Sequence, residues 1–124
     1  MIFEPGHIYH LYNQGNNRQK IFFSERNYLF FKEKIREHVL PYGHILGWVL
    51  MPNHFHLMVE VFSVGATPSH PDTKTTPTLN HSIGIMLRSY TRAINNQEKR
   101  SGALFREETK SECLSNPGKI TPSW

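Results

Sequence analysis

The stretch MPNHFHLMVEV, Met51 to Val61, determines how the rest of the chain is interpreted. Successive side chains of a strand point to opposite faces of a sheet, so alternate residues share a face. One face of this stretch is entirely apolar and consists of Phe55, Leu57, Val59 and Val61. The other face carries His54, His56, Met58 and Glu60. The pattern predicts a strand that packs its apolar side on helices and turns two histidines toward an open side.

The segments on either side of this strand complete a six-element pattern. HILGWVLM, His44–Met51, is strand-like, and the Pro-Asn turn after it makes a hairpin with the histidine strand. Upstream we expect a strand over residues 7–13 and a helix from Ser24, as N-cap, to about Val39. Downstream we expect a mobile loop at 63–78, a helix at 79–97 and a strand within 103–114. The order β-α-β-β-α-β predicts an α+β fold of the ferredoxin-like, split βαβ type, with two helices on one face of an antiparallel sheet.

Apolar residues at helical spacing mark the buried sides of both predicted helices. In the first helix they are Tyr28, Phe31, Ile35 and Val39. In the second helix we expect the buried side to comprise Leu79, Ile83, Met86, Tyr90, Ala93 and Gln97. Arg88, Arg92, Asn95 and Lys99 fall on another face of that helix. The pattern predicts one domain over residues 7–114 and a disordered tail over 115–124.

Composition narrows the classes of function. The chain has 124 residues and a net charge of +4, which is compatible with a polyanionic partner. It has no apolar run of about 18 residues, so we expect no membrane span. The single Cys113 excludes an internal disulfide and a zinc site built from several cysteines. With no secretory signal at the N-terminus, these features predict a cytoplasmic protein.

The histidine pair has two interpretations from the residues alone. Alternate positions on a strand lie roughly 7 Å apart at their Cα atoms, so both rings could converge on one divalent ion. A third ligand would then come from elsewhere in the chain. Alternatively, His54 and His56 are ordinary half-exposed strand residues. Spacing leaves both interpretations open.

Four segments together resemble a known family. They are YHLYNQGNNRQKIF (Tyr9–Phe22), GWVLMPNHFHLMVEV (Gly47–Val61), SYTRAIN (Ser89–Asn95) and SGALFR (Ser101–Arg106). They resemble the single-tyrosine HUH transposases, especially the group associated with repetitive extragenic palindromes (REP). The resemblance covers roughly residues 7–114, and MPNHFHL is its most specific block.

The resemblance implies a concrete chemistry. Such proteins are ferredoxin-like homodimers that bind single-stranded DNA folded into hairpins. His54 and His56 would hold Mg²⁺ or Mn²⁺, which polarises a scissile phosphate. A tyrosine then attacks, leaving a 5′-phosphotyrosine link and a free 3′-hydroxyl. These are expectations carried by the resemblance.

The chain departs from the family pattern at its C-terminal end. The family's nucleophilic tyrosine and its third metal ligand lie on a helix after the last strand, but no tyrosine follows Tyr90. We expect a shortened member that does not cleave DNA by itself; a fragment, a remnant and a frameshifted copy are all compatible with this. Tyr90 lies on the apolar stripe of the second predicted helix, so we expect it to be a core residue. It is the alternative candidate for the nucleophile.

Two further groups are candidate DNA contacts. The family resemblance assigns DNA contact to Asn13, Asn16, Asn17 and Arg18, although a self-satisfied polar turn explains them equally well. Arg88 and Arg92 are either a solvated helix face or part of a phosphate-binding stripe. Two rival functions remain: a single-strand DNA-binding module without metal, and an RNA-binding domain. No strand has the aromatic-rich pattern of RNA-recognition domains, which weighs against the second.

Overall fold

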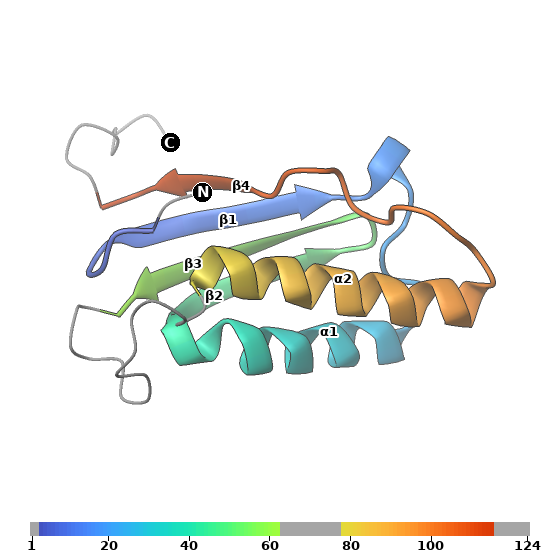
Figure 1. The fold of residues 1–124 in the computed structure, drawn as a ribbon, viewed down its shortest axis with the longest axis horizontal. Helices are drawn as coiled ribbons and strands as arrows, with labels where there is room; N and C mark the ends of the chain where they lie inside the picture. Colours follow the sequence, from blue (N-terminus) through green and yellow to red (C-terminus); the bar gives the residue numbers. More distant parts are fainter. Residues whose placement is uncertain (1–2, 63–77, 116–124) are drawn as a thin grey trace.

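The computed structural model describes residues 3–62 and 78–115, and these form two layers (Figure 1). One layer is a four-stranded antiparallel sheet in the order β2-β3-β1-β4. The strands are β1 (Ile8–Gln14), β2 (Gly43–Met51), β3 (His54–Val61) and β4 (Lys110–Cys113). The helices α1 (Glu25–His38) and α2 (Leu79–Glu98) cover one face of the sheet. The predicted ferredoxin-like fold is confirmed.

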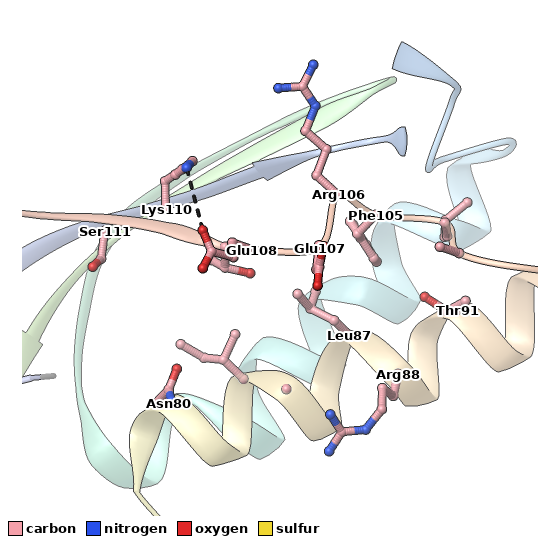
Figure 2. Close-up of a pocket in the computed structure, with 15 residues that line it drawn as sticks. Asn80, Leu87, Arg88, Thr91, Phe105, Arg106, Glu107, Glu108, Lys110 and Ser111 are labelled. Atoms are coloured by element: carbon pink, nitrogen blue, oxygen red, sulfur yellow. Dashed lines mark ion pairs between the residues drawn. The ribbon is translucent and has the colours of Figure 1, made fainter. Parts of the chain in front are cut away.

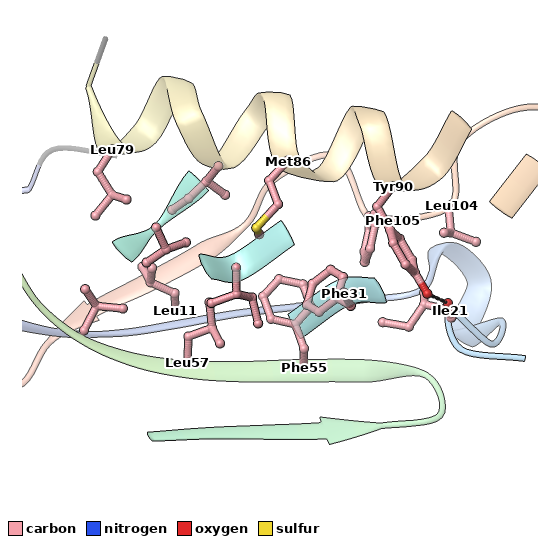
Figure 3. Packing of buried hydrophobic residues seen from close by; sticks show 14 of the residues in the cluster. Leu11, Ile21, Phe31, Phe55, Leu57, Leu79, Met86, Tyr90, Leu104 and Phe105 are labelled. Carbon is pink, nitrogen blue, oxygen red and sulfur yellow. Dashed lines mark hydrogen bonds between the residues drawn. The ribbon is translucent and has the colours of Figure 1, made fainter. Parts of the chain in front are cut away.

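The alternation in β3 has the predicted effect. Phe55, Leu57 and Val59 are buried, whereas the histidines between them are only half-buried. Figure 3 shows Phe55 and Leu57 of β3 directed toward α2, with Phe31 packed among them. The helices therefore cover one side of the sheet, and the other side remains open to solvent.

The buried side of α2 differs from the prediction in its last turns. Leu79, Ile83, Met86 and Tyr90 are buried as expected. The stripe then continues through Ile94, which is 1% exposed, while Gln97 lies at the surface. Ile94 is buried because its apolar side chain is larger than that of Ala93. Gln97 is polar, and its side chain exchanges hydrogen bonds with the side chain of Asn27 on α1.

Local caps fix the starts of both helices. Ser24 accepts a hydrogen bond from the backbone of Asn27, as predicted for the N-cap of α1. Thr78 does the same for α2 by accepting from the backbone of His81. A cap satisfies one of the backbone N–H groups that have no partner in the first turn of a helix.

The last strand is shorter than predicted. The sequence predicted a strand near Ala103–Leu114, but only Lys110–Cys113 pairs as β4. Leu104 and Phe105 are adjacent and both buried, which alternating strand geometry does not allow. This segment instead crosses the end of β1, where the backbone of Asn16 donates to Leu104 and that of Arg106 donates to Gln14.

Two expectations fall outside the described residues. The loop predicted at 63–78 lies there except for Thr78, and so does the tail predicted at 115–124 except for Ser115. Neither helix of the described part is long and apolar enough to cross a membrane.

Candidate metal and nucleic-acid site

The hairpin turn that presents the histidines is held by backbone contacts from the β1 end. Gly15 donates to the carbonyl of Asn53, and Ile21 donates to that of Pro52, both at 2.8 Å. Gly15 is required here because a Cβ at this position would lie 1.9 Å from the carbonyl oxygen of Gln19. The start of β3 is therefore anchored to the loop that follows β1.

His54 and His56 lie on the open face, as the alternation predicted, with ring centroids 5.1 Å apart and planes nearly perpendicular. Each ring has its Nδ1 atom engaged. Nδ1 of His54 lies 2.8 Å from Oδ1 of Asn53, and Nδ1 of His56 lies 2.8 Å from Nε2 of His10. Among residues 3–62 and 78–115, no side chain or backbone group forms a hydrogen bond with the Nε2 atom of either ring.

The environment of His56 favours its neutral form. Burial lowers the pKa of His56 below its ordinary value, and nearby His10 and His54 lower it further because a second positive charge there is repelled. A neutral imidazole keeps the lone pair that a metal ion requires. At neutral pH His56 is thus a competent ligand.

Tyr12 and His10 on β1 extend the site. Tyr12 is paired directly across the strands with His56. The rings of Tyr12, His10 and His56 are nearly parallel, with centroids 4.6 Å apart for Tyr12–His10 and 5.0 Å for His10–His56. Three neighbouring, nearly parallel rings on an open sheet face resemble the aromatic surfaces on which unpaired bases stack.

A pocket of about 300 Å³ opens beside these rings. His54, His56 and Tyr12 line it together with two cationic residues that the sequence reading did not single out, Arg106 and Lys110. The Gln14 side chain faces Arg106, and with its amide oxygen toward the guanidinium it accepts from Nε at 2.8 Å. Glu108 also lines the pocket, and its carboxylate lies 3.9 Å from Lys110. The pocket thus combines imidazoles, a phenol and a mostly cationic rim.

The donor set fits a partial divalent-metal site. Two imidazole nitrogens suit Mn²⁺ better than Mg²⁺, which prefers oxygen ligands. Within residues 3–62 and 78–115, no group of three or more His, Cys, Asp or Glu side chains is arranged to hold a metal ion. Further ligands would have to be water or phosphate oxygens.

The turn residues predicted to contact DNA divide into two kinds. The Asn13 side chain is buried and donates to the Arg106 carbonyl and to Thr109 Oγ1, while accepting from the Gln14 backbone. Its contacts are those of a structural residue that fixes the 106–109 segment. Asn17 and Arg18, in contrast, are exposed in a short 3₁₀ turn, and Asn16 is half-buried there.

Arg88 and Arg92 are exposed on α2, on the helical side of the sheet. Arg88 borders a second pocket, of about 620 Å³, between α2 and residues 103–111 (Figure 2). Its guanidinium lies back over Gly84, whereas that of Arg106 extends away from α2. The structure therefore does not bring the two α2 arginines together with the histidine pair.

Tyr90 lies in the core, as the apolar stripe indicated. Its side chain is fully buried among Phe31, Phe22 and Phe105. Of the five tyrosines in the chain, all within the described residues, Tyr12 alone lines the histidine pocket.

The fold of this chain is similar to the folds of two solved transposase structures. The fold matches the structure of a REP-associated tyrosine transposase bound to a REP hairpin, with a TM-score of 0.62 and 13% identity over 95% of this chain. The chain shares its fold with this structure. It also matches the crystal structure of a candidate transposase from Deinococcus radiodurans R1, with a TM-score of 0.56 and 20% identity over 94% of this chain.

This chain spans 62% of the length of the REP-associated transposase and 83% of that of the Deinococcus protein. No family model and no curated protein matches the sequence. The resemblance carried by the four sequence segments is therefore supported by structural similarity, which at these identities concerns the fold.

Proposed function

We propose that this chain is a transposase-type DNA-binding domain that takes a single-stranded DNA hairpin and holds a divalent cation at His54 and His56. The observation that carries this proposal is the joint placement of both imidazoles, Tyr12, Arg106 and Lys110 around one pocket on the open face. When bound, the cation supplies Lewis-acid polarisation of a phosphate.

The surrounding residues have separate parts in binding DNA. Arg106 and Lys110 are placed to contact phosphates, and the half-buried Tyr12 ring in the pocket offers an aromatic surface to a base. Asn16, Asn17 and Arg18 extend the surface at the end of β1. Arg88 and Arg92 remain a second candidate phosphate stripe on the other side of the molecule.

Strand cleavage is a separate proposal, because it needs a nucleophile close to the phosphate held at the histidines. Tyr90 is buried on the helical side of the sheet, so we propose that the described domain binds DNA without attacking it. The resemblance places the family's nucleophile on a helix after the last strand, and no tyrosine of this sequence follows Tyr90.

Mn²⁺-dependent DNA binding tests the proposal. A fluorescent DNA hairpin with a single-stranded flank is titrated with the chain, with Mn²⁺ and with EDTA. We expect tighter binding with Mn²⁺ and loss of that difference in His54→Ala/His56→Ala. His44→Ala/His81→Ala is the matched control, since both residues are exposed and lie outside the pocket. Equal binding by the wild type and the His54/His56 variant, with and without Mn²⁺, would refute the metal site.

We also propose that the domain self-associates, through β2. The family resemblance implies a homodimer, and pairing of two sheets at their edges cannot use the histidine strand β3, because β3 lies inside the sheet between β2 and β1. Of the two outer strands, β2 has nine residues and β4 four. Leu46 and Trp48 of β2 are 49% and 52% exposed, and such a long apolar edge favours pairing with a second copy.

A further inference from the structure

A chain of three side chains crosses three adjacent strands behind His56. Glu112 on β4 lies directly opposite His10 on β1, and its carboxylate is 3.9 Å from His10 Nδ1. His10 Nε2 in turn lies 2.8 Å from Nδ1 of His56 on β3. Glu112 and His10 thus lie on the Nδ1 side of the His56 ring, opposite the Nε2 atom that would bind a ligand.

The position of each proton follows from the acceptors at the two ends of this chain. A carboxylate only accepts, so it favours a proton on His10 Nδ1. Neutral His10 then has a lone pair on Nε2, and the short contact requires the proton between the rings to belong to His56 Nδ1. This leaves the lone pair of His56 on Nε2.

We propose that His10 and Glu112 are positioning residues that hold His56 in its Nδ1–H tautomer and fix its ring plane, so that Nε2 is the metal-binding atom. The inference deepens the proposed function, because it assigns the outer partners of one proposed ligand. His54 is held in the same way by a different residue, since Oδ1 of Asn53 accepts from its Nδ1. Both ligands would then present Nε2 to the pocket.

Outer partners of this kind set the tautomer of a ligating histidine and prevent its ring from rotating away. The hydrogen bond to His10 lies close to the planes of both rings, which are 18° apart, so it resists rotation of the His56 ring. Because His10 has no place in the pocket lining, its effect on a bound ion would pass through His56.

The tautomer can be measured without any metal. In ¹⁵N-labelled wild-type chain, long-range ¹H–¹⁵N spectra above pH 7 should show His56 protonated at Nδ1. His10→Phe keeps an aromatic ring at this position but removes the acceptor, so His56 should shift toward the Nε2–H form. His10→Gln retains an acceptor and should preserve Nδ1–H. A wild-type His56 protonated at Nε2 would overturn the inference.

Metal affinity gives the second readout. Mn²⁺ binding, followed by electron paramagnetic resonance, should weaken about 10- to 100-fold in His10→Phe and recover in His10→Gln. Glu112→Gln should weaken it less, because this carboxylate is 61% exposed. Glu60→Gln is the matched control, because it removes the same charge from the open face at the far end of β3.

The two proposals fail in different ways. Wild-type affinity in His10→Phe, with both proteins folded by circular dichroism, would refute the positioning role and leave the metal site intact. If the wild type binds no Mn²⁺ at His54 and His56, the proposed metal function fails, and the ¹⁵N tautomer then decides the inference about His10 alone.

Discussion

The hydroxyl of Tyr90 donates a 2.6 Å hydrogen bond to the backbone carbonyl of Ile21 in the core. This contact joins α2 to the loop that leads from β1 into α1, and Figure 3 shows it at the end of the Tyr90 side chain, next to Ile21. Burial raises the pKa of Tyr90 well above its ordinary value. A phenol held this way is a structural group on the side of the sheet opposite the histidines.

Replacing Tyr90 by Phe should therefore lower stability. The ring packing is retained, but the Ile21 carbonyl loses its buried donor, which costs about 1–3 kcal/mol in the free energy of unfolding. Urea denaturation followed by circular dichroism measures this. Tyr42→Phe, at a half-buried position outside the pocket, is the control and should change stability less. Equal stability of Tyr90→Phe and the wild type would contradict the structural role.

The chain should form no covalent link to DNA. Attack on a phosphate requires the nucleophile within about 3–3.5 Å and in line, and Tyr90 faces the core. Labelled hairpin DNA incubated with the chain and Mn²⁺ should migrate as free DNA on a denaturing gel.

Tyr12 is the sharpest control for that experiment, because it alone among the tyrosines shares the pocket with His54 and His56. An adduct lost in Tyr12→Phe would make Tyr12 a nucleophile. An adduct lost in Tyr90→Phe would contradict the burial argument, provided that this variant remains folded.

Acidification should destabilise the fold through His56. The folded-state pKa of His56 is lowered, so on acidification the unfolded chain takes up this proton first. The free energy of unfolding is therefore highest at pH values above the pKa of histidine in the unfolded chain, about 6.5. It falls as the pH drops toward the lower pKa of His56 in the folded protein. Urea midpoints measured between pH 8 and pH 5, in wild type and His56→Gln, isolate this contribution. A pH dependence identical in both proteins would assign the loss to other groups.

The salt dependence of DNA binding should distinguish the two basic surfaces. Each phosphate contact contributes about −0.7 to the log–log salt slope for single strands. Arg106→Gln/Lys110→Gln should reduce that slope by roughly 1.4 if both residues contact phosphate. Arg88→Gln/Arg92→Gln removes the same charge from α2 and should leave it nearly unchanged. The opposite result would move the DNA to the helical side and support the predicted arginine stripe.

Self-association through β2 predicts a concentration-dependent dimer. Sedimentation at increasing protein concentration should reveal it, and Leu46→Lys/Trp48→Lys should abolish it by placing like charges on the paired edge. The matched change on the other outer strand is Ser111→Lys. A dimer lost only in the β4 variant would place the interface there, and a monomer throughout would refute the proposal.

The sequence predicted the fold and the histidine face because both follow from local alternation. Period-two burial in β3 required no knowledge of its neighbours. The extent of β4 could not be predicted this way, because Leu104 and Phe105 are fixed by contacts with distant residues of β1 and its loop. The surface position of Gln97 could not be predicted either, because its hydrogen-bond partner Asn27 lies on the other helix.

The pocket shows a similar division. His54 and His56 were found from their spacing, whereas Lys110 joins them through the pairing of β1 with β3 and β4. Arg106 reaches the pocket through the backbone hydrogen bond that it donates to Gln14. Asn13 lies on the buried face of β1 with Tyr9 and Leu11, which alternation along the strand could have indicated. Its hydrogen-bond partners in the 106–109 segment could not be predicted from the strand alone, because they lie far away in the sequence.

The inner position of β3 has a consequence for motion. Outer strands open first in the local unfolding that amide hydrogen exchange detects, and inner strands exchange last. Because β3 is paired on both sides, the backbone spacing of His54 and His56 should persist while β2 and β4 fray. Exchange protection should therefore be strongest along the strand that carries the two histidines, so that edge fluctuations leave the distance between them unchanged.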